Sequence, residues 1–148
     1  NVPGELILAD EPFPTHDDWI HNRYFADEYQ AQLQARIAEI REGSDRLLAS
    51  HGYERVDGRY ACVRPNHDKI AVFCHGGLGI TWLAHLLQLP VSIVWATFWM
   101  APSSVTTVVM DRRSERWAVP RCIAFGETAH LYKSGLPIQR RGIPENLF

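Results

Sequence analysis

The stretch KIAVFCHGGLG, residues 69–79, decides the fold that we expect for this chain. Apart from Lys69, its first six residues are apolar, and such a short continuous run of β-formers is typical of a strand buried in a parallel sheet. Three glycines follow within four residues of His75, and from Ile80 to Leu89 the pattern becomes helical. The order of strand, glycine turn and helix predicts an α/β protein.

Upstream of this stretch the sequence predicts a long helix and a hairpin. Apolar residues recur at helical spacing between about Asp27 and Ser50, and His51-Gly52 then closes the helix, with Gly52 suited to a left-handed conformation. Tyr53–Val63 is predicted to form a small hairpin around the turn dipeptide Asp57-Gly58. Residues 1–26 are predicted to be an irregular loop region, because three prolines interrupt them.

Downstream, one helix and two strands are predicted. The helix covers about Val91–Phe98, and the strands Val105–Met110 and Trp117–Ile123 are joined by a polar turn. The segment after Gly135 contains prolines and is expected to be extended. With 148 residues, the whole chain, residues 1–148, is expected to form a single domain.

Composition excludes several classes of protein. Hydrophobic residues make up 46% and charged residues 22%, and the net charge of −2 comes with scattered basic residues, which argues against a nucleic-acid partner. The longest apolar stretch, Leu86–Met100, is too short and too interrupted to cross a membrane. Three cysteines without C-x-x-C spacing predict neither a disulfide framework nor a zinc site, so we expect no metal and a cytoplasmic location.

The glycine turn after His75 is the segment most suited to chemistry. A turn of this kind points backbone N–H groups at one spot, and the helix N-terminus adds a partial positive charge there. Such a site binds anions, most often phosphate, and His75 would lie at its edge. The glycines match neither the dinucleotide-binding fingerprint nor the P-loop. The alternative to an anion site is that His75 has a structural role and the glycines only allow close packing.

The wider sequence is similar to the histidine phosphatase superfamily. Residues 70–90 resemble the segment that carries the second histidine of that family, in which an apolar strand ends in His-Gly and a Leu- and Ala-rich helix follows. Three further stretches resemble later family elements in the right order: APSSVTT (101–107), residues 117–124 and GETAHL (126–131). The resemblance covers roughly residues 15–135.

The resemblance implies a fold and an activity. The expected fold is the phosphoglycerate mutase-like three-layer α/β/α sandwich with a mostly parallel sheet, of which this chain would supply the C-terminal half. The expected activity is that of a phosphatase-type hydrolase, which acts on a small phosphorylated metabolite through a phosphohistidine intermediate and needs no cofactor. In it His75 is the catalytic residue that holds phosphate oxygens, with Gly76, Gly77 and Ser104 binding the substrate or inorganic phosphate; for Ser104 a strand-capping hydroxyl is the alternative.

The nucleophile of that family is absent from this sequence. The family's first histidine lies in an Arg-His-Gly motif, which does not occur here, and the other His-Gly, at His51, follows a helix. Because the chain begins with Asn1, we expect a missing N-terminal half that carries the motif, and we expect the 148 residues alone to be inactive. A homodimer is compatible with the sequence. Alternatives are phosphoglycerate mutase activity, a non-catalytic member that binds a phosphorylated ligand or a partner protein, and a nucleotide-binding module.

Other chemically interesting residues are expected to have ordinary roles. Asp10 and Glu11 lie near the stretch where the family's general acid is expected, but they are more simply surface carboxylates. His16 and His21 have no fixed geometry for a metal. Cys74 is expected to be buried, since neighbouring strand residues point to opposite faces. Three other residues are expected to pack or to hydrogen-bond. They are His85 on a helix, His130 in the closing signature, and Thr106 as a strand-capping hydroxyl, with a place at the border of the phosphate pocket as the alternative for Thr106.

Overall fold

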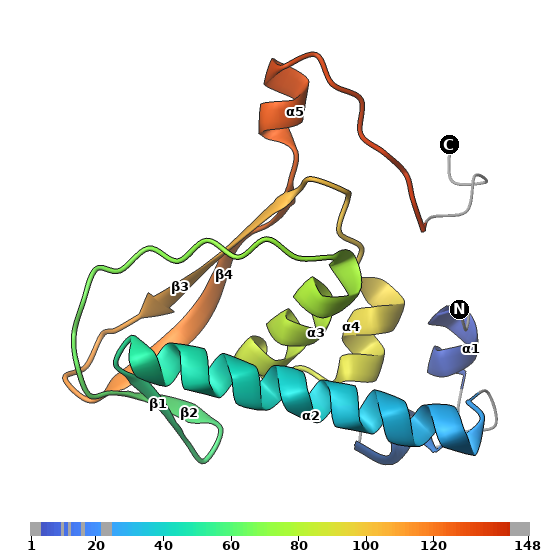
Figure 1. Ribbon diagram of the computed structural model, residues 1–148, viewed down its shortest axis with the longest axis horizontal. Helices are drawn as coiled ribbons and strands as arrows, with labels where there is room; N and C mark the ends of the chain where they lie inside the picture. The colour runs from blue at the N-terminus through green and yellow to red at the C-terminus, as the bar shows by residue number, and fades with distance from the viewer. Residues whose placement is uncertain (1–3, 10, 12, 16, 22–24, 143–148) are drawn as a thin grey trace.

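The computed structural model describes residues 4–9, 11, 13–15, 17–21 and 25–142, and Figure 1 shows the arrangement of its helices and strands. The described helices are α1 (Gly4–Leu8), the 3-10 helix η1 (Asp17–Ile20), α2 (Asp27–Ser50), α3 (Gly76–Leu87), α4 (Val91–Thr97) and α5 (Ala129–Lys133). The strands are β1 (Tyr53–Val56), β2 (Arg59–Cys62), β3 (Val105–Asp111) and β4 (Trp117–Glu127).

The long helix α2 has the predicted bounds and the predicted end. Its buried residues include Leu33, Ile37 and Leu48, which recur along one stripe, while most of its charged residues are exposed. His51 is the last residue before Gly52, whose φ of +83° lies in the left-handed region, as predicted. The backbone carbonyl of Gly52 then accepts the N–H groups of Val63 and Arg64, which ties the end of α2 to the residues after β2.

The predicted hairpin is confirmed. Strands β1 and β2 pair antiparallel, and the two turn residues Asp57 and Gly58 both have positive φ, at 47° and 77°. This is the turn geometry that matches the right-handed twist of a two-residue hairpin. Figure 1 shows the hairpin beneath the C-terminal end of α2, with which β1 packs.

The expected mostly parallel sheet is wrong. The described sheet has the order β1-β2-β4-β3, and every pairing in it is antiparallel. The three-layer sandwich built on a parallel sheet is therefore not the architecture of the described chain. The β3 and β4 strands are confirmed where they were predicted, and they form a long ribbon with two irregularities in register near Thr107.

The expected strand at Lys69–Cys74 is also wrong, and this explains the error in the sheet. Residues 65–75 run as an extended connection outside any strand, and no backbone hydrogen bond joins residues 66–74 to another part of the described chain. The β-forming sequence favours an extended backbone, but a strand exists only where a neighbour completes the ladder. No described segment lies in position to do so.

The helices that follow begin close to the predicted places. Helix α3 begins at Gly76, four residues before the predicted start, because the glycines belong to the helix rather than to a preceding turn. Helix α4 begins at Val91 as predicted, directly after Pro90. Two short helices, α1 and η1, lie within residues 1–26, where only irregular structure was expected; α1 packs on α4.

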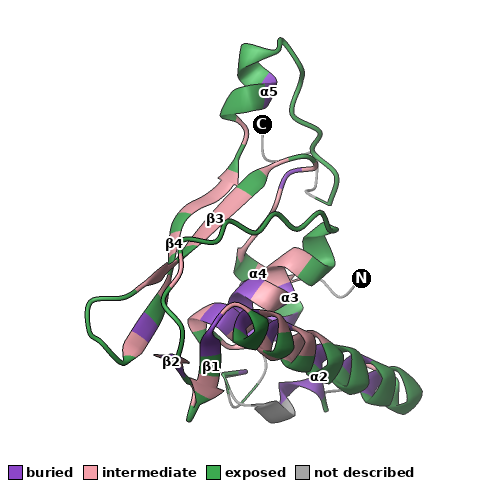
Figure 2. Cartoon of the chain, turned by 60° about the vertical axis from the view of Figure 1, so that its left-hand side comes forward, coloured by how far each residue is buried: buried purple, intermediate pink, exposed green. Residues whose placement is uncertain are grey.

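The core has two parts. The first joins α1, η1 and the first half of α2 to α3 and α4, with Ile20 and Val94 almost completely buried. The second lies where the end of α2 meets the hairpin, α3 and β4, and it centres on the fully buried Tyr60. Figure 2 shows that the burial is concentrated around α2, α3, α4 and the hairpin, while most of α5 and the connection into α3 are exposed. No described helix combines the length and the apolar character needed to cross a membrane.

Candidate functional site

The N-terminal end of α3 presents free backbone donors to solvent. His75 precedes the helix in an extended conformation, with φ −98° and ψ 159°, and its carbonyl accepts the N–H of Gly79 at 2.9 Å. The N–H groups of Gly76, Gly77 and Leu78 therefore have no partner within the helix, and no side chain caps them. A Cβ added to Gly76 or Gly77 would meet no atom within 4 Å, so this end of the helix is open.

The electrostatics of this end favour an anion. Helix α3 has twelve residues, and its aligned peptide dipoles place a partial positive charge at its start. No acidic residue occupies its first turn, so no side chain of that turn neutralises the charge. His75 is exposed, and no described residue hydrogen-bonds its imidazole. The imidazole and the three N–H groups could thus donate to the oxygens of one small anion.

Ser104 lies near the start of β3. Its N–H donates to the carbonyl of Ala101 at 3.0 Å, in a turn where Ser103 has a φ of +62°. The connection before this turn approaches α3, since Met100 Sδ would lie 3.0 Å from a Cβ on Gly79. No hydrogen bond joins Ser104 to the start of α3 among the described residues. The structure thus groups His75 with Gly76 and Gly77, but it does not bring the Ser104 hydroxyl to them.

The expectation for Cys74 is wrong. Its side chain is exposed, because no sheet covers the segment that carries it. Thr106 does have the ordinary role that was predicted, since its hydroxyl accepts the N–H of Gly126 at 3.1 Å between β3 and β4. His130 is exposed on α5, and the structural hydrogen bond expected of its side chain does not occur among the described residues.

The described residues near the N-terminus do not group into a metal site. Asp10 and His16 lie outside the described residues, and Glu11 is exposed. His21 is held by hydrogen bonds to Gln30 at 2.7 Å and to Gln34 at 2.8 Å. Within the described part of the chain, no group of three or more His, Cys, Asp or Glu side chains could hold a metal ion.

A cavity of about 390 Å³ lies along the middle of α2. Trp19, Ile20, Ile37 and Val91 form its apolar side, and polar residues of α2 border it. None of the residues predicted for the phosphate site lines this cavity. It is therefore separate from the start of α3.

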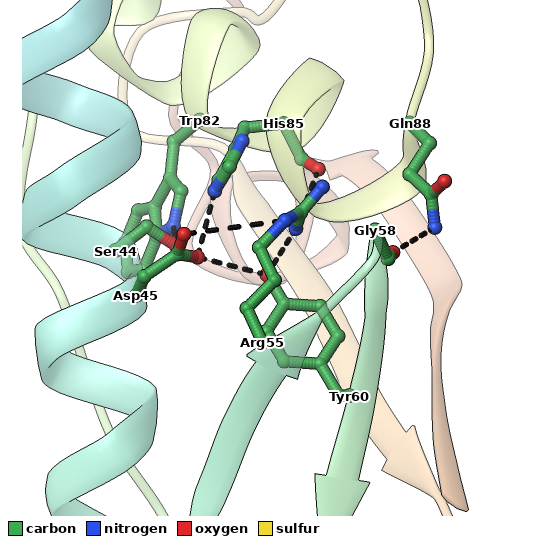
Figure 3. A network of polar contacts seen from close by, with 8 residues as sticks. All are labelled: Ser44, Asp45, Arg55, Gly58, Tyr60, Trp82, His85 and Gln88. Carbon is green, nitrogen blue, oxygen red and sulfur yellow. Dashed lines mark hydrogen bonds and ion pairs between the residues drawn. The ribbon is translucent and has the colours of Figure 1, made fainter.

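Sequence reasoning missed a polar cluster where α2, the hairpin and α3 meet, which we call the Asp45 cluster (Figure 3). The His85 ring points at Asp45, with Nε2 2.8 Å from Oδ1, and the Tyr60 hydroxyl donates to the same carboxylate at 3.4 Å. Arg55 donates to the Tyr60 oxygen at 2.7 Å and lies 4.0 Å from the second carboxylate oxygen. Beside them, Trp82 Nε1 donates to Ser44 at 2.7 Å. The cluster consists of Ser44, Asp45, Arg55, Tyr60, Trp82 and His85.

One signal in the sequence marks this cluster. The polar residue Ser44 continues the spacing of the apolar stripe of α2, between Ile37 and Leu48, and it is buried. A polar side chain on the buried stripe of a helix needs a hydrogen-bond partner, which here is Trp82. Because its side chains satisfy one another, we interpret the Asp45 cluster as a joint between three elements rather than as a reactive site.

Burial shifts the pKa values in this cluster. Desolvation lowers the pKa of His85 below its ordinary value, and the hydrogen bond to Asp45 opposes that shift only in part. Burial likewise raises the pKa of the Tyr60 hydroxyl. Both side chains are therefore held in their neutral forms, which suits a structural role.

The lowered pKa of His85 predicts a loss of stability in mild acid. The unfolded chain takes up a proton on this histidine as the pH falls through about 6.5, whereas the folded chain takes it up only at lower pH. The free energy of unfolding should therefore be fully retained above about pH 6.5. It should fall as the pH decreases from there toward the pKa of His85 in the folded state. Urea unfolding at pH 7.5 and 5.5 measures the difference. His85→Gln keeps an amide donor for Asp45 and does not titrate, so this variant should show a smaller difference in the free energy of unfolding between the two pH values. An unchanged difference would contradict the prediction.

Comparisons with protein families, with curated proteins and with solved structures gave no match to this chain.

Proposed function

We propose that this chain provides the phosphate-binding half of a phosphatase-type hydrolase that acts on a small phosphorylated metabolite. The observation that supports the proposal is the open start of α3, where three uncapped N–H groups and an exposed imidazole are available to one anion. Phosphoryl transfer depends chiefly on positioning and on stabilising charge at the non-bridging oxygens, and these donors are suited to that task. The resemblance to the histidine phosphatase superfamily supplies the reaction.

In this reaction His75 donates a hydrogen bond to a non-bridging oxygen and does not attack the phosphorus. A histidine of an Arg-His-Gly motif forms the P–N bond while the P–O bond to the leaving group breaks, and a carboxylic acid gives the leaving oxygen its proton. Water then gives a proton back to that carboxylate as its oxygen bonds to phosphorus, the P–N bond breaks, and inorganic phosphate and the free histidine are released. The motif does not occur in the 148 residues, so the proposal requires that the nucleophile come from polypeptide outside them.

The first test measures anion binding by the 148-residue chain. Inorganic phosphate or vanadate should shift the amide resonances of Gly76, Gly77 and Leu78 in a nuclear magnetic resonance titration. His75→Ala should weaken binding about tenfold or more, which is the usual effect of losing a hydrogen bond to a charged group. His130→Ala is the matched control, because that histidine is exposed but lies on α5. Equal affinity in the two variants, or no shift at the start of α3, would overturn the proposal.

The second test separates catalysis from binding. If the proposal is correct, a polypeptide that also carries the Arg-His-Gly segment should hydrolyse p-nitrophenyl phosphate. His75→Ala should lower the rate of this hydrolysis. The absence of this motif from the chain favours the alternative, a non-catalytic protein that binds a phosphorylated ligand. Phosphate binding without turnover by that longer polypeptide would support this alternative.

A further inference from the structure

The four-stranded sheet has one covered face and one open face. Helices α2 and α3 pack on the covered face, to which Tyr60, Val108 and Ala118 contribute core side chains. Successive side chains of a strand point to opposite faces, and paired residues point to the same face. The pairing register therefore places the neighbours of these residues on the open face. We call it the outer face and define it by Val56, Val109, Val119 and Ile123.

The outer face is apolar where it meets solvent. Val119 and Ile123 are 54% and 64% exposed, and Val56 and Val109 are exposed as well. A sheet face that stays in water normally carries polar residues at its outward positions. Exposed apolar side chains that gather on one face mark a site of protein interaction. The outer face is therefore suited to contact with another protein.

Trp117 lies on the same face beside two arginines. The Cζ atoms of Arg59 and Arg116 lie 4.5 and 4.7 Å from the centroid of its ring. These cation–π contacts hold the guanidinium groups close to the ring, and the N–H groups at their edges stay available to a partner. Tryptophan and arginine are among the residue types that contribute most to the binding energy of protein interfaces.

The charges on and beside the outer face are mostly positive. Asp111 points outward from β3, and both Arg113 and Arg121 pair with it. Counting the turn between β3 and β4, five arginines and three carboxylates lie here without a lysine, whereas the whole chain has a net charge of −2. The arginines are Arg59, Arg112, Arg113, Arg116 and Arg121, and the carboxylates are Glu54, Asp111 and Glu115. Because guanidinium groups pair bidentately with carboxylates, the charge favours an acidic partner.

We propose that the outer face binds a separate protein through an amphipathic helix whose aliphatic stripe is bordered by Asp and Glu. The stripe would cover the four residues that define the face, and the carboxylates would pair with the arginines around them. Helices are the elements that cover sheet faces, as α2 and α3 do on the other side. The outer face does not include the start of α3, so the proposal is independent of the proposed function.

Other occupants fit this face less well. A second copy would bring one arginine-rich surface against another, which opposes like charges. A nucleic acid would have to displace guanidinium groups from Trp117 before a base could stack there. Further polypeptide that completes the anion site has to reach the start of α3, a helix that packs on the covered face. An acidic amphipathic helix of another protein meets none of these obstacles.

Selection from a displayed library of helical peptides tests the proposal. The 148-residue chain should enrich helices that have an aliphatic stripe and an excess of Asp and Glu over Lys and Arg. Arg59→Glu together with Arg121→Glu reverses the charge of the face and should abolish that excess. Arg36→Glu together with Arg46→Glu is the matched control. It makes the same change of charge on α2, where both side chains are 73% exposed, and should leave the excess unchanged.

Binding of one selected helix, made as a synthetic peptide, locates the site. Ile123→Asp should weaken binding at least about tenfold, since it places a carboxylate among the aliphatic side chains. Tyr132→Asp, at a residue that is 90% exposed on α5, should have no effect. In a Cys74→Ser background, the peptide should protect Ile123→Cys from reaction with a maleimide, and it should not protect Tyr132→Cys.

Two results of these experiments would overturn the proposal directly. One is a selection that enriches no helix, or helices without an excess of acidic residues. The other is a peptide whose binding Ile123→Asp leaves unchanged. Circular dichroism of each variant confirms that the fold is kept, which the exposure of the substituted positions permits.

Three further results would assign the face to another occupant and would also overturn the proposal. A sedimentation mass that rises above 16.9 kDa with concentration, and does not rise in Ile123→Asp, would indicate a second copy. Binding of a single-stranded oligonucleotide that Arg59→Glu with Arg121→Glu abolishes would indicate a nucleic acid. Protection of Ile123→Cys in a longer polypeptide, without any peptide added, would indicate that this polypeptide covers the face.

Discussion

Replacing Gly52 with alanine is expected to lower the free energy of unfolding by more than about 2 kcal/mol. Gly52 has a φ of +83°, which L-residues adopt only with strain. A Cβ at this position would also clash with the carbonyl oxygen of Arg64 and lie 2.8 Å from Arg64 Cβ. Arg64 cannot simply move away, because its N–H donates to the carbonyl of Gly52. The substitution would therefore disturb the end of α2 and the residues after the hairpin together.

Gly43→Ala is the matched control for this change. Gly43 lies inside α2, and a Cβ there would meet nothing within 4 Å. Alanine favours a helix interior over glycine by about 1 kcal/mol, so this variant should be more stable than the parent chain. Urea unfolding followed by circular dichroism measures both variants. Effects of the same sign, or a Gly52→Ala variant as stable as the parent, would contradict the geometry described for this turn.

Replacing Asp45 with alanine is expected to lower the free energy of unfolding by about 2 kcal/mol. His85 and Tyr60 would lose their shared acceptor, and the His85 side chain is only 8% exposed, so water cannot fully replace it. The positive charge of Arg55, whose side chain is 20% exposed, would also lose its nearest carboxylate in the cluster. The carboxylate itself is one-third exposed, which limits the loss below that of a fully buried ion pair.

Two variants control for this change. Asp45→Asn keeps one oxygen acceptor and should recover part of the loss. Glu39→Ala removes a carboxylate from the exposed face of α2, where its pair with Arg36 lies in solvent, and should change the free energy of unfolding by less than about 1 kcal/mol. Thermal or urea unfolding at neutral pH gives the comparison. If Asp45→Ala behaved like Glu39→Ala, the Asp45 cluster would not hold the three elements together.

Local patterns predicted most of the helices and strands. The end of α2 followed from Gly52, and the hairpin from Asp57-Gly58, because a turn residue fixes backbone angles that do not depend on distant contacts. The strand at Lys69–Cys74 was wrong for the opposite reason. Its residues favour an extended backbone, and its partners would have to come from elsewhere, so composition alone could not decide whether a ladder forms.

The candidate site was predictable in part. His75, Gly76 and Gly77 are neighbours in sequence, and a helix start brings them together without tertiary contacts. Ser104 was placed there by resemblance, which required a sheet that the described chain does not form. The Asp45 cluster joins residues as far apart as Asp45 and His85, and only the packing of α2 against α3 unites them.

The two parts of the core differ in how much chain must be ordered to build them. Most of the second part lies within the 15 residues from Leu48 to Cys62, and its first contacts close short loops. The first part joins Ile7 and Ile20 to Val94, and the buried hydroxyl of Ser92 donates to the carbonyl of Pro14, 78 residues earlier in the chain. Closing so long a loop costs more chain entropy and slows folding. The hairpin end of α2 should therefore nucleate folding, with docking of the N-terminal segment as the late step.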